Sequence, residues 1–318
     1  MIKTGLHIGI RHLSLVRVKK FGKKVYLNRY KIIDIPEGLI ITSPVESNIS
    51  DEEEFNKRLA QLFDSTIKKD SEISLSLPDQ SVRLLLLELD FIPSDRRELE
   101  GIIRWNMEKK SLQLFNNTRL SYQILEKAST RSNNKNLLLV STIKDNILQQ
   151  YEEIITSYRV QPVIIDVSSF HIFNLFHNSI ITNPALKGHD FIFLSLTDIT
   201  FTIMVFKRGI LDFTRIKGFR DNLLLEDENR DIIISKTIEE LKLSLSFYSK
   251  GKDLSQIANI FIFADTAYKG IYQRIENELS LKTDALSQKM LPFLKGFSEI
   301  KEEEYSEFIP AIAAAIGR

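Results

Sequence analysis

Residues 5–33, GLHIGIRHLSLVRVKKFGKKVYLNRYKII, decide the fold of this chain. They predict three antiparallel strands, at residues 6–10, 13–18 and 25–33, with a tight turn around Gly22. Apolar and polar side chains alternate through the second of these strands, as a strand with one buried face requires. The stretch therefore predicts a β-meander at the start of a sheet.

The same order of elements recurs in the second half of the chain. The recurring strands are predicted at residues 191–196, 200–206 and 210–216, with a turn at 207–209. Each meander is followed by a helix, two further strands and a last helix. These elements are predicted at 51–68, 73–77, 163–167 and 169–176 in the first half, and at 232–248, 260–263, 283–286 and 305–316 in the second. Repetition of this kind predicts two mixed-sheet lobes built on one α/β plan.

The stretch from 79 to 160 has no counterpart in the second half. It predicts a subdomain of its own, with elements at 82–89, 94–110, 120–125, 137–142 and 144–158. We therefore expect three units, with a cleft between the two lobes. They are a first lobe at 1–78 and 161–186, an inserted subdomain at 79–160, and a second lobe at 187–318.

Composition excludes several classes of function. Forty-three basic and 42 acidic residues leave a net charge of +1, which argues against nucleic acid as the main partner. The chain has no cysteine, so disulfides and thiolate metal sites are excluded, and we read its five histidines as structural or surface residues that bind no metal. No apolar run approaches the ~20 residues of a membrane span. No signal-peptide pattern precedes the first strand, and the lack of cysteine is compatible with a reducing cytoplasm.

Short stretches along the whole chain resemble the PilM family of type IV pilus assembly, which is related to FtsA. These stretches lie at residues 5–9, 35–38, 102–105 with Glu108, 121–125, 162–167 and 243–248. The resemblance implies a duplicated actin-like (ribonuclease H-like) α/β fold, with an inserted FtsA-type subdomain in the first lobe.

The resemblance also implies an adaptor rather than an enzyme. Members of the family lie on the cytoplasmic face of the inner membrane and bind the N-terminal cytoplasmic tail of PilN, which links them to PilO and the pilus ATPases. By this likeness we expect a scaffold that reaches the membrane only through its partner, with homo-oligomers an open question. The cleft between the first lobe and the insert is the expected place for the tail. Trp105, on the predicted insert helix, is expected in the core, and a place in the peptide groove is the alternative.

Actin-like ATPases hold the phosphates of ATP with an Asp-x-Gly hairpin from each half, and a Gly-rich loop lies against the adenosine. By the resemblance, His7 stands where the first Asp is expected, and Gly9 is retained after it. Ser195 takes the Asp position of the second hairpin, although a shifted register would use Asp198. Asp265 stands in the adenosine loop, where a glycine would permit close approach. We therefore expect no catalytic residue, no cofactor and no ATP hydrolysis.

Two other functions remain open. The chain could bind ATP and Mg²⁺, either as an ATPase or as an FtsA-like polymerising element, and it could serve a related secretion machine instead of a pilus. The expected loss of all three nucleotide motifs speaks against the ATP-binding alternative.

The turn at residues 19–24 concentrates four lysines around Phe21. We interpret it as a solvated hairpin tip, and contact with anionic lipid headgroups is the alternative.

Overall fold

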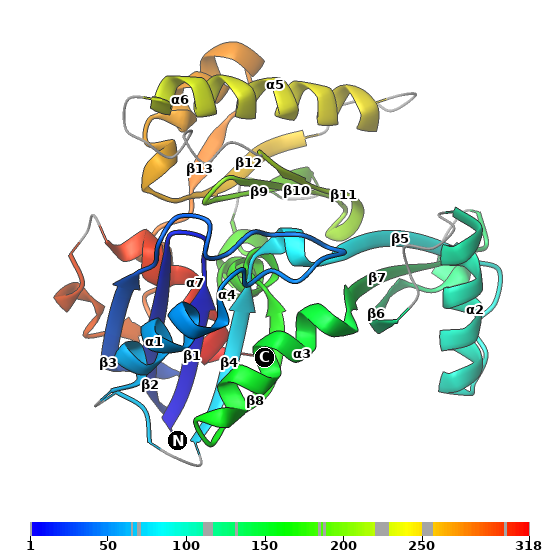
Figure 1. The fold of residues 1–318 in the computed structure, drawn as a ribbon. Coiled ribbons are helices and arrows are strands. Elements are labelled where there is room, and N and C mark those ends of the chain that lie inside the picture. Colours follow the sequence, from blue (N-terminus) through cyan, green and yellow to red (C-terminus); the bar gives the residue numbers. More distant parts are fainter. Residues whose placement is uncertain are drawn as a thin grey trace.

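The computed structural model describes residues 2–64, 66–68, 71–110, 117–130, 133–183, 186, 189–219, 229–249, 257–301 and 304–317. Residue 65 of the predicted helix at 51–68, and the expected start of the second lobe at 187, lie outside these residues. Two large sheets lie one above the other, and a smaller sheet projects to one side (Figure 1).

The first sheet has six strands in the order β14-β3-β2-β1-β4-β8. Its strands are β1 (Ile2–Ile8), β2 (His12–Phe21), β3 (Lys24–Asp34), β4 (Ser71–Leu77), β8 (Val160–Val167) and β14 (Leu294–Lys295). The first three form an antiparallel meander, and β4 and β8 continue the sheet in parallel to β1. The meander predicted from the opening stretch is confirmed.

The second sheet has five strands in the order β11-β10-β9-β12-β13. They are β9 (Asp190–Thr197), β10 (Thr200–Lys207), β11 (Ile210–Gly218), β12 (Ile257–Ala264) and β13 (Thr283–Ala285). An antiparallel meander is again extended by two strands parallel to its first strand. The order matches β3-β2-β1-β4-β8 strand for strand, so the predicted duplication of the fold is confirmed.

Helices cover both faces of the two sheets. They are α1 (Glu52–Phe63), α3 (Asp145–Ser157), α4 (Ser168–Ile181), α5 (Arg230–Tyr248), α6 (Ile271–Leu279) and α7 (Tyr305–Ile316). The apolar side chains of α1 and α3 share one core with the first sheet, and α5 and α6 cover the outer face of the second. The helices α4 and α7 pack together between the two sheets. Short 3-10 turns lie at Asp79–Ser81, Ala128–Thr130, Thr266–Tyr268, Gln288–Met290 and Phe297–Glu299.

The last helix, α7, packs closely on the first sheet, although the sequence assigned it to the second lobe. An ideal Cβ added to Gly5 on β1 would lie 2.0 Å from the carbonyl oxygen of Ala311 and 2.5 Å from the backbone nitrogen of Ala315. Only a glycine therefore lets α7 lie this close to the strand. The helix contributes Ala311 and Ala315 to the buried face, where small side chains permit the approach.

The insert is a three-stranded antiparallel sheet in the order β5-β7-β6, covered by one helix. Its elements are β5 (Arg83–Leu89), α2 (Arg96–Lys110), β6 (Thr118–Glu126) and β7 (Asn136–Lys144). Leu87, Ile103 and Leu138 are among the buried side chains of its small separate core. By contrast, the buried side chains of α3 belong to the core of the first lobe. We therefore propose residues 82–144 as the packed insert, in place of 79–160.

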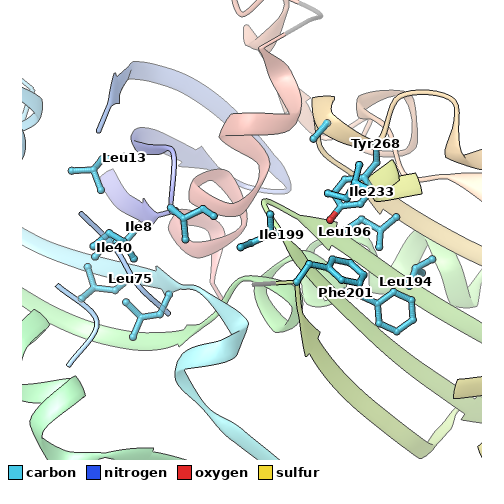
Figure 2. Close-up of a cluster of buried hydrophobic side chains, with 14 of the residues drawn as sticks. Ile8, Leu13, Ile40, Leu75, Leu194, Leu196, Ile199, Phe201, Ile233 and Tyr268 are labelled. Atoms are coloured by element: carbon cyan, nitrogen blue, oxygen red, sulfur yellow. The ribbon is translucent and has the colours of Figure 1, made fainter. Parts of the chain in front are cut away.

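Figure 2 shows how the main core continues from one lobe to the other. Ile8 and Leu75 come from the first sheet, and Leu194 and Phe201 come from the second. Ile199, in the turn between β9 and β10, lies between these two groups. The turn that faces the first lobe is thus anchored by an apolar side chain. Within the described part of the chain, no helix is both long and apolar enough to cross a membrane.

Candidate functional site

The three loops that the sequence linked to nucleotide binding come together between the two lobes. The turn from β1 to β2 carries Gly9 and Arg11, the turn from β9 to β10 carries Asp198, and Asp265 follows β12. Because β1 and β9 hold equivalent central positions in their sheets, their turns meet face to face. This is the expected location of the phosphate groups in an actin-like fold.

One arginine binds carboxylates from both lobes at this point. Nε of Arg11 lies 3.2 Å from Oδ1 of Asp198, and a terminal nitrogen of the same guanidinium lies 3.2 Å from Oδ2 of Asp265. Oε1 of Glu307, on α7, lies 3.5 Å from Arg11 and accepts a hydrogen bond from Thr266 at 2.9 Å. We call Arg11, Asp198, Asp265 and Glu307 the interlobe clasp.

The carboxylate of Asp198 also binds the backbone of the first hairpin. Its Oδ2 accepts the N–H of Ile10 at 3.0 Å. Asp198 has a φ of +53°, and its own N–H donates to Oδ2 of Asp265. A Cβ added to Gly9 would lie 3.1 Å from Oδ2 of Asp198, so the glycine makes room for this carboxylate. The backbone donor that the motif offers to a phosphate is here bound to a side chain of the protein itself.

The burial and the charges of the clasp shift the pKa values of its own carboxyl groups. Burial acts to raise the pKa of Asp198, but the charges of Arg11 and His12 hold it below its usual value. Burial raises the pKa of Asp265, to about 8, and the negative charges of Glu307 and Asp198 act in the same direction, against Arg11. The pKa values of the two carboxylates therefore shift in opposite directions, as expected when carboxylates share a single cation.

His7 lies below the clasp with a neutral ring. Its Nδ1 is 3.3 Å from the carbonyl oxygen of Ser76 and 3.3 Å from Oγ of Ser168, so Nδ1 carries the hydrogen in this arrangement. Burial, with the nearby His12, lowers the pKa of His7 to about 3. Nε2 of His12 lies 3.3 Å from Oε2 of Glu307, an ion-pair distance without hydrogen-bond geometry. A buried neutral imidazole supplies no negative charge for Mg²⁺, whose preferred ligands are carboxylate and phosphate oxygens.

The remaining predicted residues occupy separate positions. Ser195 is buried within β9, and its Oγ contacts no hydrogen-bond partner. Asp198, the first residue after β9, supplies the carboxylate of this turn, so the shifted register is the one that the fold uses. Glu307 was not anticipated from the sequence, because it lies on α7, outside the three loops that the sequence linked to nucleotide binding.

A second tie between the lobes lies beside the base of the insert. The buried carboxylate of Asp79 accepts the backbone N–H of Ser169 at 2.9 Å and the hydroxyl of Thr202 at 2.5 Å. The side-chain amide of Gln80 donates to Oγ1 of Thr200 at 2.8 Å. The start of β10 is thus bonded to the first lobe at a point separate from the clasp.

Two adjoining cavities form a groove between the insert and the body of the protein. The larger, of about 520 Å³, lies between the insert sheet, α4 and the second sheet. The smaller, of about 290 Å³, lies between the insert sheet and β8. Gln123, Leu139 and Phe170 line both cavities, so we treat them as one groove and name it the insert groove.

The groove uses the face of the insert sheet that α2 leaves uncovered. Leu138 and Val140 of β7 point into the small core beneath α2. Because successive side chains of a strand alternate between faces, Leu139 and Ser141 point to the other side, where they line the groove. On β6, Gln123 is paired with Leu139 and lies on the same face. One sheet therefore has a packed apolar face and a second face that is open to a ligand.

Trp105 is neither part of a buried core nor part of the insert groove. Its side chain is 55% exposed on the outward face of α2, with the ammonium of Lys109 3.3 Å from the ring centroid. The expectation of a core tryptophan was wrong, because the helix turns Ile103 and Met107 inward and position 105 outward. Trp105 is not among the residues that line the insert groove.

Two duplicated lobes whose first hairpins face each other define an actin-like protein. The chain matches a structure of a PilM–PilN type IV pilus biogenesis complex with a TM-score of 0.79 and 14% identity, over 99% of this chain and 96% of that one. An actin-like ATPase-fold protein of unknown function from Bacteroides thetaiotaomicron matches with a TM-score of 0.51 and 11% identity, over 90% of each chain. The cytoplasmic domain of EpsL, an inner-membrane component of the Vibrio cholerae type II secretion system, matches with a TM-score of 0.51 and 8% identity, over 100% and 96%.

The family follows from the sequence itself. Residues 5–227 match the model of the type IV pilus assembly protein PilM, so the chain belongs to the PilM family. No protein in the curated collection matches it.

Proposed function

We propose that this protein is a non-enzymatic adaptor that holds the cytoplasmic tail of a PilN-like inner-membrane protein in the insert groove, within a type IV pilus or related secretion machine. The observation that carries the proposal is the groove itself, which is open along one face of the insert sheet. Membership of the PilM family supports the pilus role, and a solved structure of the same fold is a complex with PilN.

The groove suits an extended peptide. The strand β6 is an edge of the insert sheet, so its outer N–H and C=O groups are available to a further strand. Along β6, Ser121 and Gln123 line the groove, and Phe170 of α4 faces them from the other wall. Arg119 and Asp166 add one charge of each sign to the lining. A bound strand could thus pair with β6 and seat every second side chain against apolar surface.

The clasp supports an adaptor that works without ATP hydrolysis. Phosphate groups would have to displace the Asp198 carboxylate from the N–H of Ile10 and from Arg11. They would also meet the carboxylates of Asp265 and Glu307 at the same place. Like charges repel strongly where water is excluded, so a nucleotide would gain little binding free energy here. The protein would also lose an internal ion pair.

The position in the cell follows from the partner under this proposal. A tail that leads to a membrane-spanning segment would hold the adaptor at the cytoplasmic face of the inner membrane. Contacts with PilO and the pilus ATPases would then be indirect, through PilN.

The test is a titration of a labelled PilN-like tail peptide with this protein, followed by fluorescence anisotropy with and without ATP. We expect saturable binding in roughly the micromolar range, unchanged by ATP. Ser121→Arg should weaken binding at least tenfold, because the exposed Ser121 lines the groove and a long cation would fill it. Trp105→Ala is the matched control on the outward face of the same subdomain, and it should bind as the wild type does.

Three outcomes would contradict the proposal. Absence of binding at ~100 μM protein, well above the expected constant, would exclude an adaptor for that peptide. Equal losses in Ser121→Arg and Trp105→Ala would place the peptide elsewhere. Binding that requires ATP would favour the nucleotide-dependent alternative.

A further inference from the structure

One end of the first sheet carries lysines and exposed apolar side chains on the same face. In the sheet register, Lys19 of β2 is paired with Ile2 of β1 and with Tyr26 of β3, and Tyr26 is paired with Lys295 of β14. Two rungs further out, and so on the same face, Phe21 is paired with Lys24. Paired residues of neighbouring strands point to the same side of a sheet. These residues are Ile2, Lys19, Phe21, Lys24, Tyr26 and Lys295, and we call them the tip face.

The tip face is the uncovered continuation of a covered one. Leu13 and Leu15 lie on the same side of β2, since they are separated from Lys19 by an even number of residues, and both are buried in the core that includes α1. Between them and Lys19 stands Arg17, whose guanidinium donates to the carbonyl oxygen of Thr66 at 2.8 Å, where the chain leaves α1. Beyond Arg17, the side chains of Lys19 and Phe21 on this side of β2 are exposed.

The apolar side chains of this face are unusually exposed to solvent. Phe21 is 65% exposed, Ile2 47% and Tyr26 38%. The rings of Phe21 and Tyr26 meet edge to face with centroids 5.9 Å apart, so they present one joint aromatic surface. Phe21 is the last residue of β2 and stands at the outermost turn of the hairpin.

Exposed lysines surround these rings. Lys19, Lys24 and Lys295 are exposed, as are Lys20 and Lys23 of the adjoining turn. Within the part of the chain that the structure describes, none of the five forms an ion pair with a carboxylate. The chain as a whole carries a net charge of only +1. The positive charge is therefore concentrated locally at the tip.

We propose that the tip face docks on an anionic lipid bilayer, with Phe21 and Tyr26 at the depth of the headgroups and the lysines against the lipid phosphates. The sequence favoured a solvated hairpin tip, and the exposed aromatic pair within the lysine cluster is what changes this interpretation. Aromatic rings beside cationic chains are the composition that favours the membrane–water interface. The shape agrees, because a projecting turn fits a flat surface, and none of the tip-face residues lines the insert groove.

A protein docked through the tip face would leave the interlobe clasp and the insert groove uncovered. The strand β1 runs from the tip face towards the second lobe, so the tip lies at the end of the first lobe opposite the clasp (Figure 1). Docking there would cover neither the turn that carries Arg11 nor the groove beside the insert. The proposal therefore stands or falls independently of tail-peptide binding.

The experiment is sedimentation with vesicles of phosphatidylcholine, alone or with about 30 mol% phosphatidylserine. The wild type should bind the anionic vesicles and not the neutral ones, and binding should decline as salt rises from about 0.1 M to 0.5 M. Replacing both Lys19 and Lys24 by Gln should lower the partition coefficient by at least tenfold, since each lysine near an anionic surface contributes about fivefold. Phe21→Ser should also weaken binding while leaving the charge unchanged.

The matched control is the pair Lys236→Gln and Lys282→Gln, two exposed lysines of the second lobe. It removes the same charge and should bind as the wild type does. A second measurement reports location: in a Phe21→Trp variant that also carries Trp105→Phe, the emission should shift to the blue with anionic vesicles. The proposal is wrong if the wild type ignores anionic vesicles, if both lysine pairs reduce binding equally, or if the tryptophan at position 21 keeps its emission. Binding to polyglutamate or to nucleic acid without binding to vesicles would likewise overturn it.

Discussion

Oδ2 of Asp198, on the second lobe, accepts the backbone N–H of Ile10, on the first lobe, at 3.0 Å. In an actin-like hairpin that N–H faces the phosphate groups of a nucleotide. Here an internal carboxylate takes the place of the external anion, and Arg11 binds the same carboxylate at 3.2 Å. Side chains of the two lobes therefore bind each other directly at this point.

The first prediction concerns the strength of this contact. Arg11→Gln and Asp198→Asn should each destabilise the protein by about 2 kcal/mol, because each leaves a buried or half-buried charge without its partner. In a double-mutant cycle the coupling should be about 1 kcal/mol or more. The control cycle uses Arg96 and Glu100, an exposed i,i+4 pair on α2 at 2.9 Å, which should couple by less than about 0.5 kcal/mol. Urea unfolding measures both, and equal coupling in the two cycles would contradict the clasp.

The second prediction is that ATP with Mg²⁺ does not bind. Titration calorimetry should give no heat beyond dilution, because the hairpin donors are occupied and His7 offers no carboxylate to the metal. A dissociation constant in the low micromolar range, about −8 kcal/mol, would contradict it.

The third prediction concerns the contact between β1 and α7. Gly5→Ala should destabilise the protein by about 3 kcal/mol, since its Cβ would lie 2.0 Å from a backbone oxygen that cannot move without the helix. Gly101→Ala is the control, because nothing lies within 4 Å of its Cβ in the middle of α2. It should stabilise by up to about 1 kcal/mol, as alanine is the better helix former. Similar midpoints of denaturant unfolding for the two variants would disprove the close approach.

The fourth prediction is a dependence of stability on pH that comes from His7. Unfolded histidine is protonated below about pH 6.5, whereas burial lowers the pKa of folded His7 to about 3. The unfolded state therefore binds more protons between these values, and stability falls as pH decreases, by up to about 1.4 kcal/mol per unit. The raised pKa of Asp265 acts in the opposite direction between about pH 4 and 8, and it is common to both proteins compared below.

The measurement is urea unfolding of the wild type and of His7→Gln at several pH values from 4 to 7. The wild type should lose stability more steeply towards pH 4 than the variant does. His189→Gln, which removes an exposed histidine, should follow the wild type. Parallel curves for the wild type and His7→Gln would show that His7 does not have the lowered pKa.

The insert groove and the exposed position of Trp105 could not be predicted from the sequence. Alternation along residues 120–125 and 137–142 indicated strands, but it did not show which face α2 covers. That face depends on which side the helix packs, and Leu99, Ile103 and Met107 decide it. Trp105 lies outward although its neighbours Ile102 and Ile103 made a core position attractive.

The sequence by itself determined the duplicated strand order, the insertion into the first lobe and the replacement of Asp by His7 in the first hairpin. Each of these follows from local pattern, because periodicity and turn residues act between near neighbours in the chain. Only the tertiary structure decided that Glu307 and Arg11, 296 positions apart, share an ion pair, and that α7 lies on the first sheet. It also decided that Ile2, Lys19, Tyr26 and Lys295 form one row. Such contacts depend on how separate elements pack, and the local sequence of an element does not specify the partner it meets.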